Sequence, residues 1–267
     1  MRSSFISQFI GLPFALLLVV LPSRAQEIRV AAAADLKFAM QDLAAQFQKN
    51  TGTAVDVTYG SSGNFFSQLQ NGAPFDIFFS ADVDYVVRLK TLGLTDPGSS
   101  FFTYAIGRIA IWMPPESEAD PAHQAWHAIL NSKIHKIAIA NPDHAPYGRA
   151  AVAALKKAGL YERIKPKLVY GENIAQAAQF VQSGNAQAGI IALSLALSPA
   201  MKRGKLWEIP EDQHPPIEQA AVILRDAKNK ESARAFCEFV TSEPGRATLV
   251  KYGFAMPHIE LPTAPKK

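Results

Sequence analysis

The fold is decided by EIRVAAAADLKFAMQDLAAQF, residues 27–47. Its first part, residues 27–34, has the composition of a buried strand that ends in small residues. Four apolar side chains then recur at the spacing of one helical face, namely Leu36, Met40, Leu43 and Phe47. Asp35 stands where a helix N-cap is expected. The stretch therefore predicts a strand, a tight turn and an amphipathic helix, the first half of a βαβ unit.

The same alternation continues toward the C-terminus. Residues 55–59 alternate apolar and polar side chains, and residues 60–64 have the composition of a turn that leads into a helix. DIFFSA, residues 76–81, is typical of a buried parallel strand, and residues 83–91 are predicted to be helical. This order predicts an α/β fold with a doubly wound sheet, in which ligands bind at the carboxyl ends of the strands.

A second alternating block follows, without a Gly/Ser linker before it. We therefore expect two doubly wound α/β lobes joined by two crossing strands, which we place at residues 101–105 and 217–222. The C-terminal helices would return to the first lobe. The predicted boundaries are a signal peptide at 1–25, lobe 1 at 26–104 plus 221–262, lobe 2 at 105–220 and a frayed tail at 263–267.

The N-terminal residues 1–25 have the pattern of an export signal. Arg2 is basic, residues 9–21 are apolar, and small residues surround the expected cleavage site near Ala25. We expect a periplasmic protein whose mature chain begins at Gln26, with a retained membrane anchor as the alternative. Because no cysteine follows the leader directly, a lipid anchor is not expected.

Composition excludes several classes of function. The 27 basic and 23 acidic residues leave a formal net charge of +4, and no basic stripe with interleaved aromatic residues indicates a nucleic-acid partner. The single cysteine, Cys237, falls on an apolar helical face and is expected to be a buried thiol. The histidines lack metal-ligand spacing, and no nucleotide-binding or nucleophile motif is found. We therefore expect no metal, no cofactor and no catalytic residues.

Small residues at the strand-to-helix turns are the candidate site. The first backbone N–H groups of a helix have no partner within it, and they favour an anion. The candidate ligand-binding residues are Ala34, Asp35, Ser61, Ser62, Tyr147 and Ile174, with Lys37 and Asn173 beside them. Ordinary structural roles remain open for these residues: a common turn at the serines, a turn aromatic at Tyr147, a helix cap at Asp35 and a surface position for Lys37.

Four segments resemble, in order, the periplasmic molybdate-binding proteins, the solute-binding components of molybdate ABC importers. They are AAAADLKFAMQDLAAQF (31–47), YGSSGNFFSQLQNGAPFDIFFSADVDYVVRL (59–89), IAIANPDHAPYGRAAVAALKKAGL (137–160) and YGENIAQAAQFVQSGNAQAGIIALSLA (170–196). The resemblance implies the type II periplasmic binding protein fold, in which two lobes close over the ligand. It also implies molybdate or tungstate as the ligand, a membrane ABC permease as the partner and a monomer.

The resemblance also assigns ligand positions one at a time. Ser62 matches the family's serine in the second turn, and Ile174 matches a backbone N–H donor. Tyr147 stands before the glycine of the third segment, where some members use a tyrosine hydroxyl. Ala192 departs from the pattern, because some members have a tyrosine donor there. We expect the hydroxyl of Tyr147 to replace that donor.

Asp35 is a second departure, because the family often has serine at this position. A carboxylate facing a dianion is repulsive, so Asp35 would either turn away as the N-cap and offer only its backbone N–H, or be offset by Lys37. A site made only of donors favours fully deprotonated tetrahedral dianions. Sulfate, another small anion or a carboxylate is the alternative ligand, and an enzyme on the same fold, with Asp35 and Lys37 as its only candidate pair, is the remote alternative.

Overall fold

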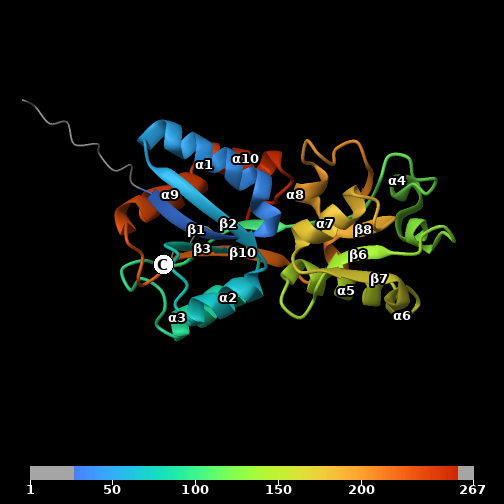
Figure 1. Ribbon diagram of the computed structural model, residues 1–267, viewed down its shortest axis with the longest axis horizontal. Helices are drawn as coiled ribbons and strands as arrows, with labels where there is room; N and C mark the ends of the chain where they lie inside the picture. Colours follow the sequence, from blue (N-terminus) through green and yellow to red (C-terminus); the bar gives the residue numbers. More distant parts are fainter. Residues whose placement is uncertain (1–26, 258–267) are drawn as a thin grey trace, which may run out of the picture.

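The computed structural model describes residues 27–257, and the predicted signal peptide, its cleavage site and the predicted frayed tail lie outside these residues. Within the described chain, the strands form two five-stranded sheets, one in each of two lobes that lie side by side along the long axis (Figure 1). Two α/β lobes were the expected architecture, and this prediction is confirmed.

The first sheet has the strand order β2-β1-β3-β10-β4. Its strands are β1 (Glu27–Ala33), β2 (Ala54–Gly60), β3 (Ile77–Ser80), β4 (Phe102–Gly107) and β10 (Ile217–Ile223). β1 pairs in parallel with β2 and β3, whereas β10 pairs antiparallel with β3 and β4. The sheet is therefore mixed, because a strand from the far end of the chain completes it.

Helices cover both faces of this sheet (Figure 1). One face packs against α1 (Lys37–Thr51), α9 (Lys230–Thr241) and α10 (Glu243–Lys251), the other against α2 (Ser62–Gln70) and α3 (Val83–Thr91). Successive β1 side chains point to opposite faces, so Val30 joins the first cluster and Ala31 the second. Cys237 lies in the first cluster, where burial raises the pKa of its thiol to about 12. An inert, buried thiol was the expectation.

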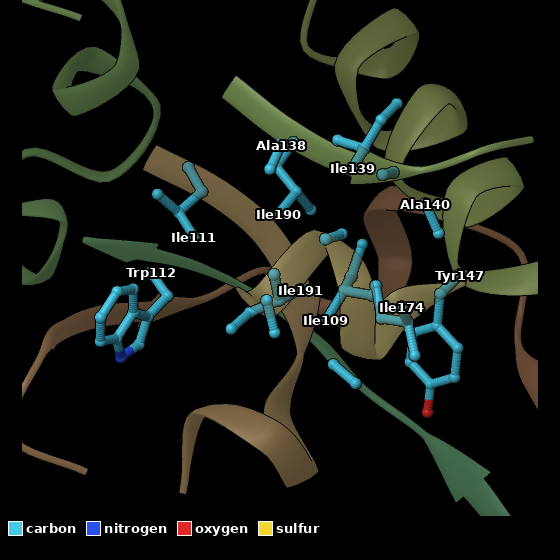
Figure 2. Close-up of a cluster of buried hydrophobic side chains, with 14 of the residues drawn as sticks. Ile109, Ile111, Trp112, Ala138, Ile139, Ala140, Tyr147, Ile174, Ile190 and Ile191 are labelled. Atoms are coloured by element: carbon cyan, nitrogen blue, oxygen red, sulfur yellow. The ribbon is translucent and has the colours of Figure 1, made fainter. Parts of the chain in front are cut away.

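The second sheet has the order β7-β6-β8-β5-β9. Its strands are β5 (Ile109–Met113), β6 (Ile137–Ala140), β7 (Leu168–Gly171), β8 (Ala188–Ala192) and β9 (Lys205–Glu208). Its helices are α4 (Pro121–Gln124), α5 (Pro146–Lys157), α6 (Tyr161–Ile164), α7 (Ile174–Gln182) and α8 (Leu193–Ala196). Branched side chains such as Ile109, Ile111 and Ile190 fill the interior of this lobe (Figure 2).

The chain crosses between the sheets twice. Arg108 alone separates β4 from β5, and residues 209–216 lead from β9 back to β10. The segments predicted as crossing strands, 101–105 and 217–222, lie largely in β4 and β10, which pair with each other inside the first sheet. The predicted lobe limits at 104/105 and 220/221 therefore fall within these two strands, whereas the sheets divide just after β4 and just before β10.

Between residues 27 and 257, no helix combines the length and the apolar character that crossing a membrane requires.

Candidate anion-binding site

Strand register brings the candidate turns together in pairs. In the first sheet Ala33 is paired with Gly60, so the turns that follow β1 and β2 leave the same sheet edge side by side. In the second sheet Ala140 is paired with Gly171, so the loops leading to α5 and α7 also leave together. Both pairs follow the carboxyl ends of parallel strands, where an α/β sheet binds its ligands.

Residues from both lobes meet in one buried cluster. Ala34 of the first lobe belongs to the same cluster of buried side chains as Tyr147, Ile174 and Ala192 of the second lobe. Figure 2 shows Tyr147 beside Ile174 at one edge of this cluster, with the phenol oxygen pointing away from the isoleucine side chains of the sheet. The structure thus places four of the predicted site residues at the junction of the lobes.

The two serines of the second turn have different surroundings. The Ser62 hydroxyl is buried and accepts a hydrogen bond from the backbone N–H of Ala81 at 2.9 Å. That bond orients the hydroxyl and leaves its hydrogen to donate to a ligand. Ser61 is the N-cap of α2, where its hydroxyl accepts from the N–H of Asn64 at 3.3 Å and lies 3.0 Å from Nδ1 of His144. Ser62 is therefore the stronger candidate donor.

Asp35 and Tyr147 are joined directly across the lobes. Oδ2 of Asp35 accepts from the Tyr147 hydroxyl at 2.9 Å and from Nε2 of Gln219 at 2.6 Å. Gln219 also donates to the Tyr147 oxygen at 3.0 Å, and its Oε1 accepts from the Tyr104 hydroxyl at 2.7 Å. The hydroxyl hydrogen of Tyr147 therefore goes to Asp35 in this structure, which leaves the backbone N–H of Tyr147 as its candidate donor to a ligand.

The Asp35 carboxyl is almost fully enclosed. Burial raises the pKa of this carboxyl to about 6, although hydrogen bonds from Gln219 and Tyr147 and the nearby N–H groups of Asp35 and Leu36 lower it in part. Oδ1 of Asp35 is buried and has no partner at hydrogen-bonding geometry. Burial also raises the pKa of Tyr147 and of Tyr104 well above 10, so both phenols are neutral at physiological pH.

Neither expected explanation for Asp35 matches its surroundings. Asp35 lies inside η1 (Ala34–Leu36), a short 3-10 turn, and the N-cap position of α1 is Leu36, which has no side-chain capping bond. The predicted cap is wrong because this extra turn separates β1 from α1. Lys37 is exposed, with its ammonium 5.7 Å from the centre of the Phe38 ring, and the structure shows no ion pair between it and Asp35. The carboxyl is instead hydrogen-bonded to two uncharged side chains, Tyr147 and Gln219.

The remaining candidates have structural surroundings. Asn173 is the N-cap of α7, and its Oδ1 accepts from the N–H groups of Ala175 and Gln176, both at 3.0 Å. Asn173 and Lys37 both line an open pocket of about 440 Å³. Ala192 ends β8, paired with Ile109. The side chains of Asn173 and Lys37 therefore lie beside the buried junction rather than inside it, whereas Ala192 belongs to the buried cluster.

Further polar contacts join the lobes. The N–H of Gly63 donates to the carbonyl oxygen of His144 at 3.0 Å, and Nδ2 of Asn64 donates to Glu172 at 3.1 Å. Arg149 forms an ion pair with Asp82. In this structure the two lobes therefore touch around the candidate turns.

Sequence reasoning missed Gln219 and Ser194. Ser194 donates to the backbone carbonyl of Asp35 at 2.8 Å, so two hydrogen bonds from the second lobe reach one residue of the first. Gln219 could have been noticed, because it is a lone amide beside the apolar run of residues 220–224. A polar group inside a buried strand needs a partner.

No group of three or more His, Cys, Asp or Glu side chains within residues 27–257 is arranged to bind a metal ion.

Two α/β lobes with candidate donors gathered at their junction define a two-lobed solute-binding protein. The chain belongs to the family described as bacterial extracellular solute-binding proteins, which it matches over residues 28–255. It is 40% identical over 245 residues to the molybdate-binding protein ModA of Azotobacter vinelandii, covering 90% of this chain and 94% of the relative. It is 37% identical over 237 residues to ModA of Rhodobacter capsulatus, covering 88% of this chain and 91% of that relative.

A solved structure agrees with these sequence relatives. The periplasmic molybdate-binding protein of Azotobacter vinelandii superposes with a TM-score of 0.80 at 33% identity, covering 86% of this chain and 99% of that chain. The fold expected from the resemblance is therefore confirmed over almost the whole described region.

Proposed function

We propose that this protein captures molybdate, or the similarly sized tungstate, in the periplasm and delivers it to a membrane ABC permease. It acts as a monomeric binding protein and not as an enzyme, and its two lobes close around the anion. The relatives named as molybdate-binding proteins support the choice of ligand.

The observation that carries the proposal is the meeting of donors from both lobes. Ser62 offers an oriented hydroxyl from the first lobe. Tyr147 is the second residue of α5 and Ile174 the first of α7, and backbone N–H groups at such positions are free of helical partners. Ala34 and Asp35 offer backbone N–H groups from the first turn. Hydrogen bonds to a charged oxygen contribute about 1.5–3 kcal/mol each. A few of them offset the cost of removing a small dianion from water.

Calorimetric titration tests the choice of ligand. We expect molybdate and tungstate to bind with similar affinity, because their sizes are nearly equal, and sulfate to bind more weakly because it is smaller. Thermal unfolding gives an independent readout, since a ligand that binds only the folded protein raises the melting temperature. A rise with sulfate as large as the rise with molybdate would contradict the proposed ligand.

Substituting Ser62 by alanine is expected to weaken molybdate binding by about 1–3 kcal/mol, because one charged oxygen loses its donor. The dissociation constant from calorimetry measures the change. Ser67→Ala is the matched control, since Ser67 is an exposed serine of the same helix. If Ser62→Ala binds molybdate as tightly as the control does, Ser62 is not part of the site.

A further inference from the structure

We propose that Asp35 determines the proton content of the bound state, so that the protein takes up one proton from solvent onto the Asp35 carboxyl when it binds its oxyanion. This inference rests on the proposed function. It makes Asp35 a specificity-determining residue of the site.

The first turn places the Asp35 carboxyl near the proposed anion site, where hydrogen-bond donors are needed. Asp35 lies in the first turn after β1, and its backbone N–H is one of the candidate donors to the anion. Its carboxyl accepts a hydrogen bond from Tyr147 of the other lobe, so the carboxyl lies at the junction where the candidate donors of both lobes meet. An ionised carboxylate only accepts hydrogen bonds, as do the oxygens of a fully ionised oxyanion. A proton on the carboxyl removes the repulsion between them.

Within residues 27–257, no cationic side chain contacts the Asp35 carboxyl or lowers its pKa. The titratable groups that face it are Tyr147 from α5 and Tyr104 from β4, and both are neutral phenols. The other polar neighbours are Gln219 from β10 and Ser194 from α8, which carry no charge.

The elements that pack against η1 include α1, α7, α8 and β2. α7 and α8 contain no titratable side chain, β2 contributes Asp56 and Tyr59, and α1 begins with the exposed Lys37. None of these charged groups contributes to the pKa of Asp35, whose shift comes from burial and hydrogen bonds.

The unpartnered oxygen is the second observation. Oδ2 of Asp35 already accepts two hydrogen bonds, whereas Oδ1 is buried with no partner at hydrogen-bonding geometry, although the N–H groups of Asp35 and Leu36 lie near the carboxyl. A buried polar atom without a partner is rare in folded proteins. Protonated Oδ1 becomes a donor, which an anion can use, whereas ionised Oδ1 is one more acceptor in a site that needs none.

The sign of the pH dependence follows from linkage. In this structure, where the lobes are in contact, the pKa of Asp35 is about 6, and a nearby dianion raises it further. Binding therefore takes up a proton at any pH between these two pKa values. Affinity falls as pH rises, by up to about tenfold per pH unit. For molybdate, which is itself fully ionised over this range, we expect binding to weaken from pH 6.5 to pH 8.5, by at most about 100-fold.

Calorimetry with molybdate in two buffers of different ionisation enthalpy counts the protons. We expect an uptake approaching one proton at pH 7.5 for the natural chain and none for Asp35→Asn, whose affinity should also be independent of pH. Asp56→Asn is the matched control, because it makes the same chemical change on an exposed carboxylate of the same lobe. It should behave like the natural chain.

The outcomes separate this inference from the function on which it rests. Binding of molybdate by the natural chain without proton uptake, and with constant affinity from pH 6.5 to 8.5, overturns the inference and leaves the proposed function standing. Absence of binding heat with molybdate, tungstate and sulfate overturns both. The number of protons taken up by the natural chain tests the inference even if Asp35→Asn fails to fold.

Discussion

Gly63→Ala is expected to weaken molybdate binding about 100-fold, close to 2.7 kcal/mol. A Cβ added at Gly63 would lie 2.5 Å from the carbonyl oxygen of His144 and 2.8 Å from the Tyr85 hydroxyl. The carbonyl belongs to the backbone of the other lobe, so the lobes must move apart to make room. Overpacking of this kind costs about 1–3 kcal/mol. The dissociation constant from calorimetry measures the loss.

The unliganded protein should tolerate the same change. Once the lobes separate, the added methyl group no longer meets His144, and only the hydroxyl end of the Tyr85 side chain, from the same lobe, has to shift. Alanine is also favoured over glycine in a helix such as α2. The melting temperature without ligand should therefore stay close to that of the natural chain. Gly98→Ala is the control, since its added Cβ would meet its nearest neighbours at 3.6 Å, an ordinary contact. Unchanged affinity in Gly63→Ala would mean that the bound form lacks the contact between Gly63 and His144.

Asp76→Ala is expected to lower the free energy of unfolding by about 3–5 kcal/mol. The Asp76 carboxylate is buried and accepts from the N–H of Arg29 on β1 and from the N–H of Lys228 before α9, both at 2.7 Å. Alanine leaves both donors in the interior without partners. Urea unfolding followed by circular dichroism measures the change.

An exposed aspartate provides the comparison. Asp226 pairs with Arg225 at 3.3 Å, but its side chain is 82% exposed. Exposed ion pairs contribute little, so Asp226→Ala should leave the free energy of unfolding nearly unchanged. If the two variants unfold at the same urea concentration, the buried carboxylate does not stabilise the first lobe as described.

Much of the fold could be predicted because local signals agree with the global arrangement. The helical spacing from Leu36 to Phe47 and the apolar run before Ala81 each predict an element that the structure contains, in α1 and β3. The crossing points were less predictable. β4 and β10 are paired strands of one sheet, and only pairing between distant segments decides where that sheet ends. No local sequence pattern indicates where the sheet ends.

The candidate site shows the same division. Turns at strand ends could be predicted to meet, because parallel strands place them at one edge, and Ala34, Tyr147 and Ile174 do lie in one cluster. The partners of their polar groups could not be predicted. The Tyr147 hydroxyl donates to Asp35, and Gln219 joins both from 72 residues beyond Tyr147. Such a network depends on contacts between lobes, which the sequence of a single turn does not encode.

The position of β10 has a consequence for how the chain must be assembled. This strand lies between β3 and β4 in the first sheet, although 109 residues separate the end of β4 from its first residue. A nascent or truncated chain that stops before Ile217 leaves two unpaired sheet edges, which are prone to aggregation. The second lobe contains its strands in one continuous stretch and is free of this dependence. The first sheet can therefore form completely only after the chain has been synthesised through β10.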